Sequence, residues 1–347
     1  MREVQGPANT FTRVNLFAKS VKAVLLAALA SFLVTGCDFT GGQLETALCS
    51  NGIAVTDPHE NADLVGDCAT LLGVREELAG EVSLNWSAQL PMEEWDGVGI
   101  DTEEAPPRVT EVRLDGRGLT GKLSPSLGSL SSLEGLWLHG NRLSGEIPAE
   151  FGKLTNLEWL WLYDNRLTGE IPAELGALAA LQGLGLQENH LSGVIPPELG
   201  NLANLEWLHL FNNDLSGAIP AELGALTNME GLRLDGNGLT GPIPTELSKL
   251  ARLRELELSD NRLSGPIPVE LSALSSLEWL RLNDNRLEGG IPIELTGLNR
   301  LRELGLAHNR LTGEIPTELS NFSFLEALDL QGNQLTGAIP GGLGRLA

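Results

Sequence analysis

The stretch "LEWLWLYDNRLTGEIPAELGALAA", Leu157–Ala180, holds in 24 residues the pattern that decides the fold of this chain. Leucines alternate with large side chains up to Asn165, and a polar turn then leads to an Ile-Pro pair. Arg117 takes the asparagine position in a first, degenerate copy, so ten units fill residues 109–347. The other nine units repeat every 24 residues and are marked by Asn141, Asn165, Asn189, Asn213, Asn237, Asn261, Asn285, Asn309 and Asn333.

The spacing within the unit predicts how each copy folds. In the consensus LxxLxLxxNxLxGxIPxxLGxL, the LxL segment alternates and predicts a short strand with leucines on one side. The asparagine lies among leucines, so its amide must hydrogen-bond to backbone, which predicts a ladder between neighbouring coils. The glycine four residues later suits a positive φ or close packing. The proline blocks entry into a helix and holds an extended or turn backbone. A stretch such as "AELGALAAL" predicts a short helical turn.

One unit cannot bury its leucines alone, so the units must stack into a continuous core, as in leucine-rich repeats. The LxGxIPxxLGxL half resembles the plant-type subclass of these repeats, which occurs in plant receptor kinases, receptor-like proteins and polygalacturonase-inhibiting proteins. The last group also shares the layout of a cap followed by repeats without a kinase. The resemblance implies an α/β, right-handed solenoid with a parallel sheet on its concave face and helical turns on its convex face. The matching residues are scaffold, so they specify the fold rather than the function.

Residues 49–108 predict a small helical cap that covers the leucines of the first coil. An amphipathic helix is expected from about Ala62 to Leu78, with Gly80 as its stop. The segment resembles the N-terminal cap of plant-type repeat proteins at "ATLL", at Trp86 and at Trp95-Asp96-Gly97-Val98, although Glu93 and Ile100 replace that family's two cysteines. We expect Trp86 and Trp95 to belong to the core of the cap.

The first 36 residues read as an export signal. Two lysines precede an apolar run, Ala23–Val34, that is too short to span a bilayer of about 30 Å as a helix. The run ends in "VTGC", which resembles the lipobox of bacterial lipoproteins and implies cleavage and lipidation at Cys37, followed by a tether, 37–48. The resulting expectation is an exported protein, lipid-anchored to a bacterial membrane, in the periplasm or at the cell surface. The alternative is an ordinary cleaved signal peptide with a chance cysteine.

The remaining cysteines and the net charge narrow the range of partners. In an exported chain, the even pair Cys49 and Cys68 predicts a disulfide. Together with the nearby His59, these cysteines lack the spacing of a zinc site, so no metal is expected. The formal net charge of −23 repels phosphate backbones, which argues against nucleic acid and favours either cationic partners or simple solubility.

Three variable columns, at two, four and six residues before each asparagine, contain many polar residues and therefore face water. By the period of two, Trp159, Trp161 and Tyr163 must face water with them. Strands lie about 4.8 Å apart, so we expect a glycine-floored slot, open to a flat ring or an extended chain, between two aromatic units. The column seven residues before the asparagine adds an acidic edge: Glu134, Glu158, Gln182, Glu206 and Glu230. The candidate ligand-binding residues are Trp137, His139, Trp159, Trp161, Tyr163, Gly183, Gly185, Trp207, His209 and Phe211.

Two interpretations of these rings remain open. Exposed aromatic patches on a protein surface mark binding sites, and Trp and Tyr are common at interface hot spots. Alternatively, the rings only stabilise neighbouring strands by cross-strand packing.

No catalytic constellation and no cofactor motif is present in the sequence, so we expect a protein that is not an enzyme. The predicted function is recognition of a protein or peptide partner by the exposed sheet face at the bacterial cell envelope. A carbohydrate or cell-wall glycan ligand for the aromatic patch is the first alternative. A structural or adhesive surface protein without a specific ligand is the second, and the oligomeric state stays open.

Overall fold

The computed structural model describes residues 46, 48–103 and 106–345, and these form one compact unit. The predicted signal, the lipidation at Cys37 and most of the tether lie outside the described residues. Within the described ranges, no helix has the length and apolar character needed to cross a membrane.

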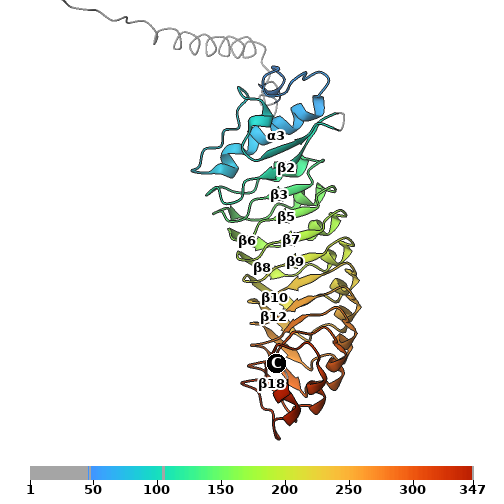
Figure 1. Ribbon diagram of the computed structural model, residues 1–347. Coiled ribbons are helices and arrows are strands. Elements are labelled where there is room, and N and C mark those ends of the chain that lie inside the picture. Colours follow the sequence, from blue (N-terminus) through green and yellow to red (C-terminus); the bar gives the residue numbers. More distant parts are fainter. Residues whose placement is uncertain (1–45, 47, 104–105, 346–347) are drawn as a thin grey trace, which may run out of the picture. The chain divides into compact units, whose positions relative to one another are not determined.

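One sheet of eleven strands runs along the stack of coils (Figure 1). Each coil adds one short parallel strand beside the strand of the coil before it, and only the first pairing, β1 with β2, is antiparallel. Leucines occupy the inner side of the strands in the coils from Gly135 to Gly305 and are fully buried there, so the predicted continuous core is confirmed. In the last strand of the sheet, Leu328 is only partly buried. In order, the strands are β1 (Val98–Asp101), β2 (Arg108–Arg113), β3 (Gly135–Trp137), β5 (Trp159–Trp161), β7 (Gly183–Gly185), β9 (Trp207–His209), β11 (Gly231–Arg233), β13 (Glu255–Glu257), β15 (Trp279–Arg281), β17 (Glu303–Gly305) and β19 (Ala327–Asp329).

A second sheet of eight parallel strands lies on another side of the coils. The sequence pattern predicted only an extended or turn backbone there, because the glycine and proline of the LxGxIP half interrupt any alternation. The glycines of this half take the expected positive φ, as at Gly145 (83°) and Gly169 (82°). In order, the strands are β4 (Ser144–Gly145), β6 (Arg166–Glu170), β8 (His190–Val194), β10 (Asp214–Ala218), β12 (Gly238–Gly241), β14 (Arg262–Gly265), β16 (Arg286–Gly289) and β18 (Arg310–Leu311).

The predicted helical turns are short 3-10 helices, and in the repeats each begins directly after an Ile-Pro pair or, in the first unit, after Leu123-Ser124. Prolines occupy the N-cap of most of them in an extended conformation, for example Pro172 with φ −64° and ψ 131°. In order, they are η2 (Pro125–Ser129), η3 (Ala149–Lys153), η4 (Ala173–Ala177), η5 (Pro197–Asn201), η6 (Ala221–Ala225), η7 (Thr245–Lys249), η8 (Val269–Ala273), η9 (Ile293–Gly297), η10 (Thr317–Asn321) and η11 (Gly341–Arg345), and η1 (Met92–Glu94) lies in the cap.

The asparagines form the predicted ladder, which Asn189 illustrates. Its amide nitrogen donates to the carbonyl oxygen of Leu162 in the preceding coil (3.1 Å) and of Leu186 in its own coil (3.0 Å). Its amide oxygen accepts from the backbone N–H of Leu167, also in the preceding coil (2.9 Å). Because the side chain is only 6% exposed, these bonds satisfy polar groups that water does not reach.

The cap is built as the sequence predicted. Its helix α3 (Ala62–Ala79) ends at Gly80, and Cys49 is bonded to Cys68 on this helix. The rings of Trp86 and Trp95 stack with centroids 6.0 Å apart inside the cap, and both are buried. The helix end is hydrogen-bonded to the first coil, where the N–H of Lys122 donates to the carbonyl of Glu77 (2.8 Å). Helix carbonyls that would otherwise lack partners are thereby satisfied by the solenoid.

Candidate functional site

The structure brings the predicted aromatic residues together on the solvent side of the eleven-stranded sheet. In β5 the burial alternates, with Leu160 inside and the two tryptophans half-buried outside. The parallel register places Trp161 beside Trp137 on one side and beside Gly185 on the other. The aromatic patch consists of eight partly exposed residues: Trp137, His139, Trp159, Trp161, Tyr163, Trp207, His209 and Phe211.

Apart from Trp137, the rings of the aromatic patch form two groups, and neighbouring rings within each group are in contact. In the first group, His139 stacks on Tyr163 with centroids 4.3 Å apart, and Trp161 meets Tyr163 edge-on at 6.3 Å. Trp159 joins this group with its centroid 5.8 Å from that of Trp161. The second group lies on one coil and has Trp207, His209 and Phe211 with successive centroids 6.0 and 6.2 Å apart. These contacts hold each ring in a defined orientation.

The expectation of a bare glycine floor between the two groups is wrong. A Cβ placed on Gly183 would lie 2.7 Å from Cε3 of Trp159, and one placed on Gly185 would lie 2.2 Å from Cε3 of Trp161. The rings of Trp159 and Trp161 therefore cover both glycines instead of leaving them open to solvent. The physical reason is burial, because a ring that lies on a strand without side chains removes more apolar surface from water. The patch offers a ring surface rather than an open slot.

Three buried polar atoms in or beside the aromatic patch have no hydrogen-bond partner among the described residues: Nδ1 of His139, Oε1 of Gln187 and Nε2 of His209. Gln187 lies between the two ring groups and is only 8% exposed. Burial, with a smaller contribution from the nearby Arg233 cation, lowers the pKa of His209 to about 4. His209 is therefore neutral at physiological pH, and the aromatic patch carries no histidine charge at that position. No feature of the sequence pattern pointed to these unpartnered atoms.

Beyond the aromatic patch, the sheet face carries paired charged side chains. Arg281 donates to the carboxylates of Glu257 and Glu303 on the two neighbouring strands. Glu257 is only 4% exposed, and desolvation raises the pKa of its carboxyl group against the opposing effect of Arg281. The sequence columns displayed these charges but not their pairing, because pairing depends on which rotamers the neighbouring strands leave free.

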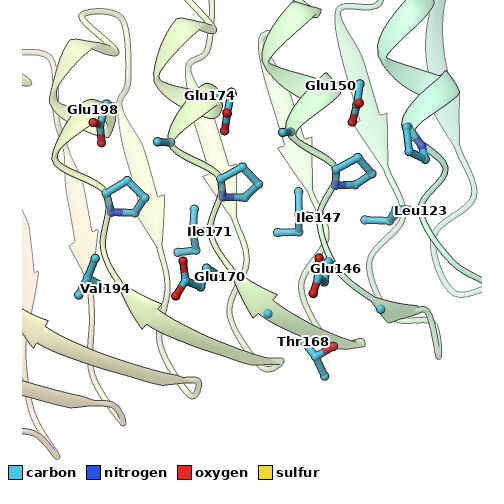
Figure 2. Close-up of a pocket in the computed structure, with 18 of the residues that line it drawn as sticks. Leu123, Glu146, Ile147, Glu150, Thr168, Glu170, Ile171, Glu174, Val194 and Glu198 are labelled. Atoms are coloured by element: carbon cyan, nitrogen blue, oxygen red, sulfur yellow. The ribbon is translucent and has the colours of Figure 1, made fainter.

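An acidic groove lies on a different side of the coils, between the second sheet and the 3-10 helices (Figure 2). Its volume is about 1060 Å³. Figure 2 shows Ile147 and Ile171 between the carboxylates of the two flanking rows. These rows recur with the repeat period and contain Glu146 and Glu170 on one side and Glu150, Glu174 and Glu198 on the other. Among the residues that the structure describes, no group of three His, Cys, Asp or Glu side chains is arranged to hold a metal ion.

Family comparisons agree with this architecture. Two leucine rich repeat family models match the chain, one at residues 227–287 and the other at 132–154, 156–178, 180–202, 204–226, 300–322 and 324–346. A comparison with curated proteins found no match.

Solved structures of plant proteins are similar to the chain. The ectodomain of the membrane receptor kinase GASSHO1/SCHENGEN3 from Arabidopsis thaliana, in complex with CASPARIAN STRIP INTEGRITY FACTOR 2, is 41% identical with a TM-score of 0.77, over 80% of this chain and 34% of that chain. The Arabidopsis receptor kinase HAESA, in complex with the peptide hormone IDA and a co-receptor, is 30% identical with a TM-score of 0.59, over 81% of this chain and 56% of that chain. The chain thus spans between a third and three fifths of these receptors.

A plant ice-binding protein is closer to this chain in length. It is 31% identical with a TM-score of 0.68, over 80% of this chain and 89% of that chain.

Proposed function

The chain belongs to the leucine-rich repeat family, and on that premise we propose that it is a non-catalytic recognition module that binds a protein or peptide through the aromatic patch. The observation that carries the proposal is the gathering of eight partly exposed aromatic and histidine rings on one sheet face, above a core made mainly of leucine. Such a surface is costly to expose unless a partner covers it. The similar receptor kinase HAESA, solved in complex with a peptide hormone and a co-receptor, supports the choice of a protein or peptide partner.

The double substitution Trp161→Ala and Trp207→Ala tests this function. We expect it to weaken binding of the partner by at least about thirtyfold, since each buried aromatic anchor contributes more than about 1 kcal/mol at an interface. The leucine core is untouched, so the thermal unfolding temperature should change little. Partners recovered with the unmodified chain would be titrated against both proteins by calorimetry. Equal affinities for the two proteins would refute the proposed site.

We also propose that the chain is exported and lipid-anchored through Cys37 to a bacterial membrane. The support is the basic, apolar and "VTGC" succession in the sequence. In a bacterial host fed with radiolabelled palmitate, the unmodified chain should become labelled and partition into the detergent phase, because two or three acyl chains anchor stably. The Cys37→Ala variant should remain unlabelled, and labelling of that variant would contradict the anchor.

A second candidate function is binding to ice, and it uses a different surface. Three residues after the asparagine position, nine of the ten units carry a hydroxyl side chain, and Glu288 is the exception. These hydroxyls lie on or beside the second sheet, and several donate to a glycine carbonyl of the preceding coil, as Ser216 does to Gly193 (3.1 Å) and Thr240 to Gly217 (3.2 Å). Each of these hydroxyl oxygens keeps its capacity to accept hydrogen bonds, and the hydroxyls recur once per coil, which suits an ordered layer of water. The similarity to a plant ice-binding protein favours this candidate.

Ice binding is tested by thermal hysteresis and by inhibition of ice recrystallisation. If this candidate holds, the unmodified chain is active in both assays. The double variant Thr168→Lys and Thr240→Lys, at two exposed positions, should lose at least about fivefold in this activity because it interrupts the row of hydroxyl groups. The variant with Trp161→Ala and Trp207→Ala should keep full activity in the same assays. Absence of activity in the unmodified chain removes the candidate.

A further inference from the structure

The aromatic patch is bounded at both ends by the chain's own guanidinium groups. The Cζ atom of Arg113 lies 3.7 Å from the ring centroid of Trp137, and the Cζ atom of Arg233 lies 4.1 Å from that of Phe211. Both are cation–π contacts at short distance, so the rings of this face do accept guanidinium groups. Between these two ends, no cation of the described residues lies over Trp159, Trp161 or Trp207.

In the half of the solenoid beyond the aromatic patch, guanidinium groups neutralise the carboxylates of the acidic edge. Arg254 pairs with Glu278 (2.7 Å), and Arg252 pairs with Glu230 (3.4 Å). Farther along, Arg302 pairs with Glu278 and Glu326, so each of these carboxylates has a guanidinium partner.

Two carboxylates of the same edge column, Glu158 and Glu206, lie beside the aromatic patch without a guanidinium partner among the described residues. Glu158 and Glu206 directly precede Trp159 and Trp207 in the sequence, and neither forms an ion pair with another described residue. Both carboxylates are partly buried, and a partly buried charge gains more from a partner than a fully solvated one. Unoccupied rings and unpaired carboxylates therefore coincide on the same coils.

We propose that the ligand of the aromatic patch is an extended, arginine-bearing peptide whose guanidinium groups stack on the central tryptophans and pair with Glu158 and Glu206. This inference rests on the proposed recognition function and specifies the chemistry of its partner. Arginine suits the site better than lysine because a planar guanidinium stacks on a ring and binds a carboxylate through two N–H groups at once.

The spacing of the two carboxylates fits a peptide that runs along the solenoid. Glu158 and Glu206 are two coils apart, which corresponds to about 10 Å at a strand spacing of about 4.8 Å. In an extended chain at about 3.4 Å per residue, two arginines separated by two to four residues reach both carboxylates with their long side chains. The net charge of −23 further attracts such a peptide to the surface.

The test uses the full-length chain and three fluorescein-labelled octapeptides, in which serine alternates with arginine, with citrulline or with glutamate. Citrulline keeps the shape of arginine and removes its charge. We expect the arginine peptide to bind at least about tenfold more tightly than the citrulline peptide by fluorescence anisotropy, with an affinity that falls as salt increases. The double variant Glu158→Gln and Glu206→Gln should lose about tenfold in affinity for the arginine peptide.

The matched control is Glu230→Gln with Glu278→Gln, which changes the net charge equally but removes carboxylates that already have arginine partners. This control should bind the arginine peptide as the unmodified chain does. Equal weakening by the two double variants, or equal affinity for the arginine and citrulline peptides, overturns the inference. If the citrulline or glutamate peptide binds well and depends on Trp161 and Trp207, the recognition function stands and only the ligand chemistry is wrong. If no peptide binds, both proposals fail for peptide ligands.

Discussion

Replacement of Asn189 by alanine is expected to lower the free energy of unfolding by about 4 kcal/mol. The N–H of Leu167 loses the buried acceptor that Asn189 provides at 2.9 Å. The carbonyl groups of Leu162 and Leu186 each lose one donor, and a cavity forms between two coils. A buried donor without a partner carries its full desolvation cost, so the effect exceeds that of an average hydrogen bond.

The comparison is Asn204→Ala, which removes a single bond from an exposed side chain to the carbonyl of Ala179 (2.9 Å). That change should cost no more than about 1 kcal/mol, since water can replace the amide. Urea denaturation followed by circular dichroism measures both variants. If the urea midpoints of the two variants shift equally, the buried asparagine ladder stabilises the solenoid no more than an exposed hydrogen bond does.

Replacement of Gly121 by alanine is expected to detach the cap from the first coil and to cost at least about 4 kcal/mol. A Cβ on Gly121 would lie 1.8 Å from the carbonyl oxygen of Glu77 and 2.5 Å from that of Leu78. Both atoms are backbone at the end of α3, and they cannot retreat without breaking the bond from the N–H of Lys122 to Glu77 (2.8 Å). Separation would expose the leucines of the first coil, so limited proteolysis should cut the cap well before the unmodified chain is cut.

The same substitution at Gly73 separates this clash from any general effect of adding a methyl group. Gly73 lies within α3, is exposed, and has open space around the position of its missing Cβ. Alanine there should raise the free energy of unfolding by up to about 1 kcal/mol, because alanine favours a helix over glycine. A destabilised Gly73→Ala variant, or a Gly121→Ala variant of normal stability, would show that the cap is held differently.

Features that repeat with the period could be predicted from the sequence, because each has one physical solution. A polar amide among leucines must bond to backbone, and Asn189 does so across two coils. Alternation around Leu160 required the tryptophans on either side to face outward, and they do. The helix before Gly80 and the disulfide between Cys49 and Cys68 followed from equally local signals.

Features that depend on rotamers could not be predicted. The sequence placed Trp161 and Gly185 on the same face, but the direction in which the ring leans depends on competition between burial and exposure. The second sheet was missed since its strands, such as β14, hold only a few residues between a glycine and a polar turn. The pairing of Arg281 with Glu257 and Glu303, and the absence of pairing at Glu158, likewise appear only when neighbouring coils are in place.

The asparagine ladder also has a mechanical consequence. Each coil is joined to the next by the same set of asparagine hydrogen bonds. A force that pulls on one end of the stack therefore has to break a similar set of hydrogen bonds to release each successive coil. A coil of 24 residues, once unfolded, spans about 80 Å when it is fully extended. The stack would therefore unfold under force one coil at a time, in steps of equal length, while the remaining coils stay folded.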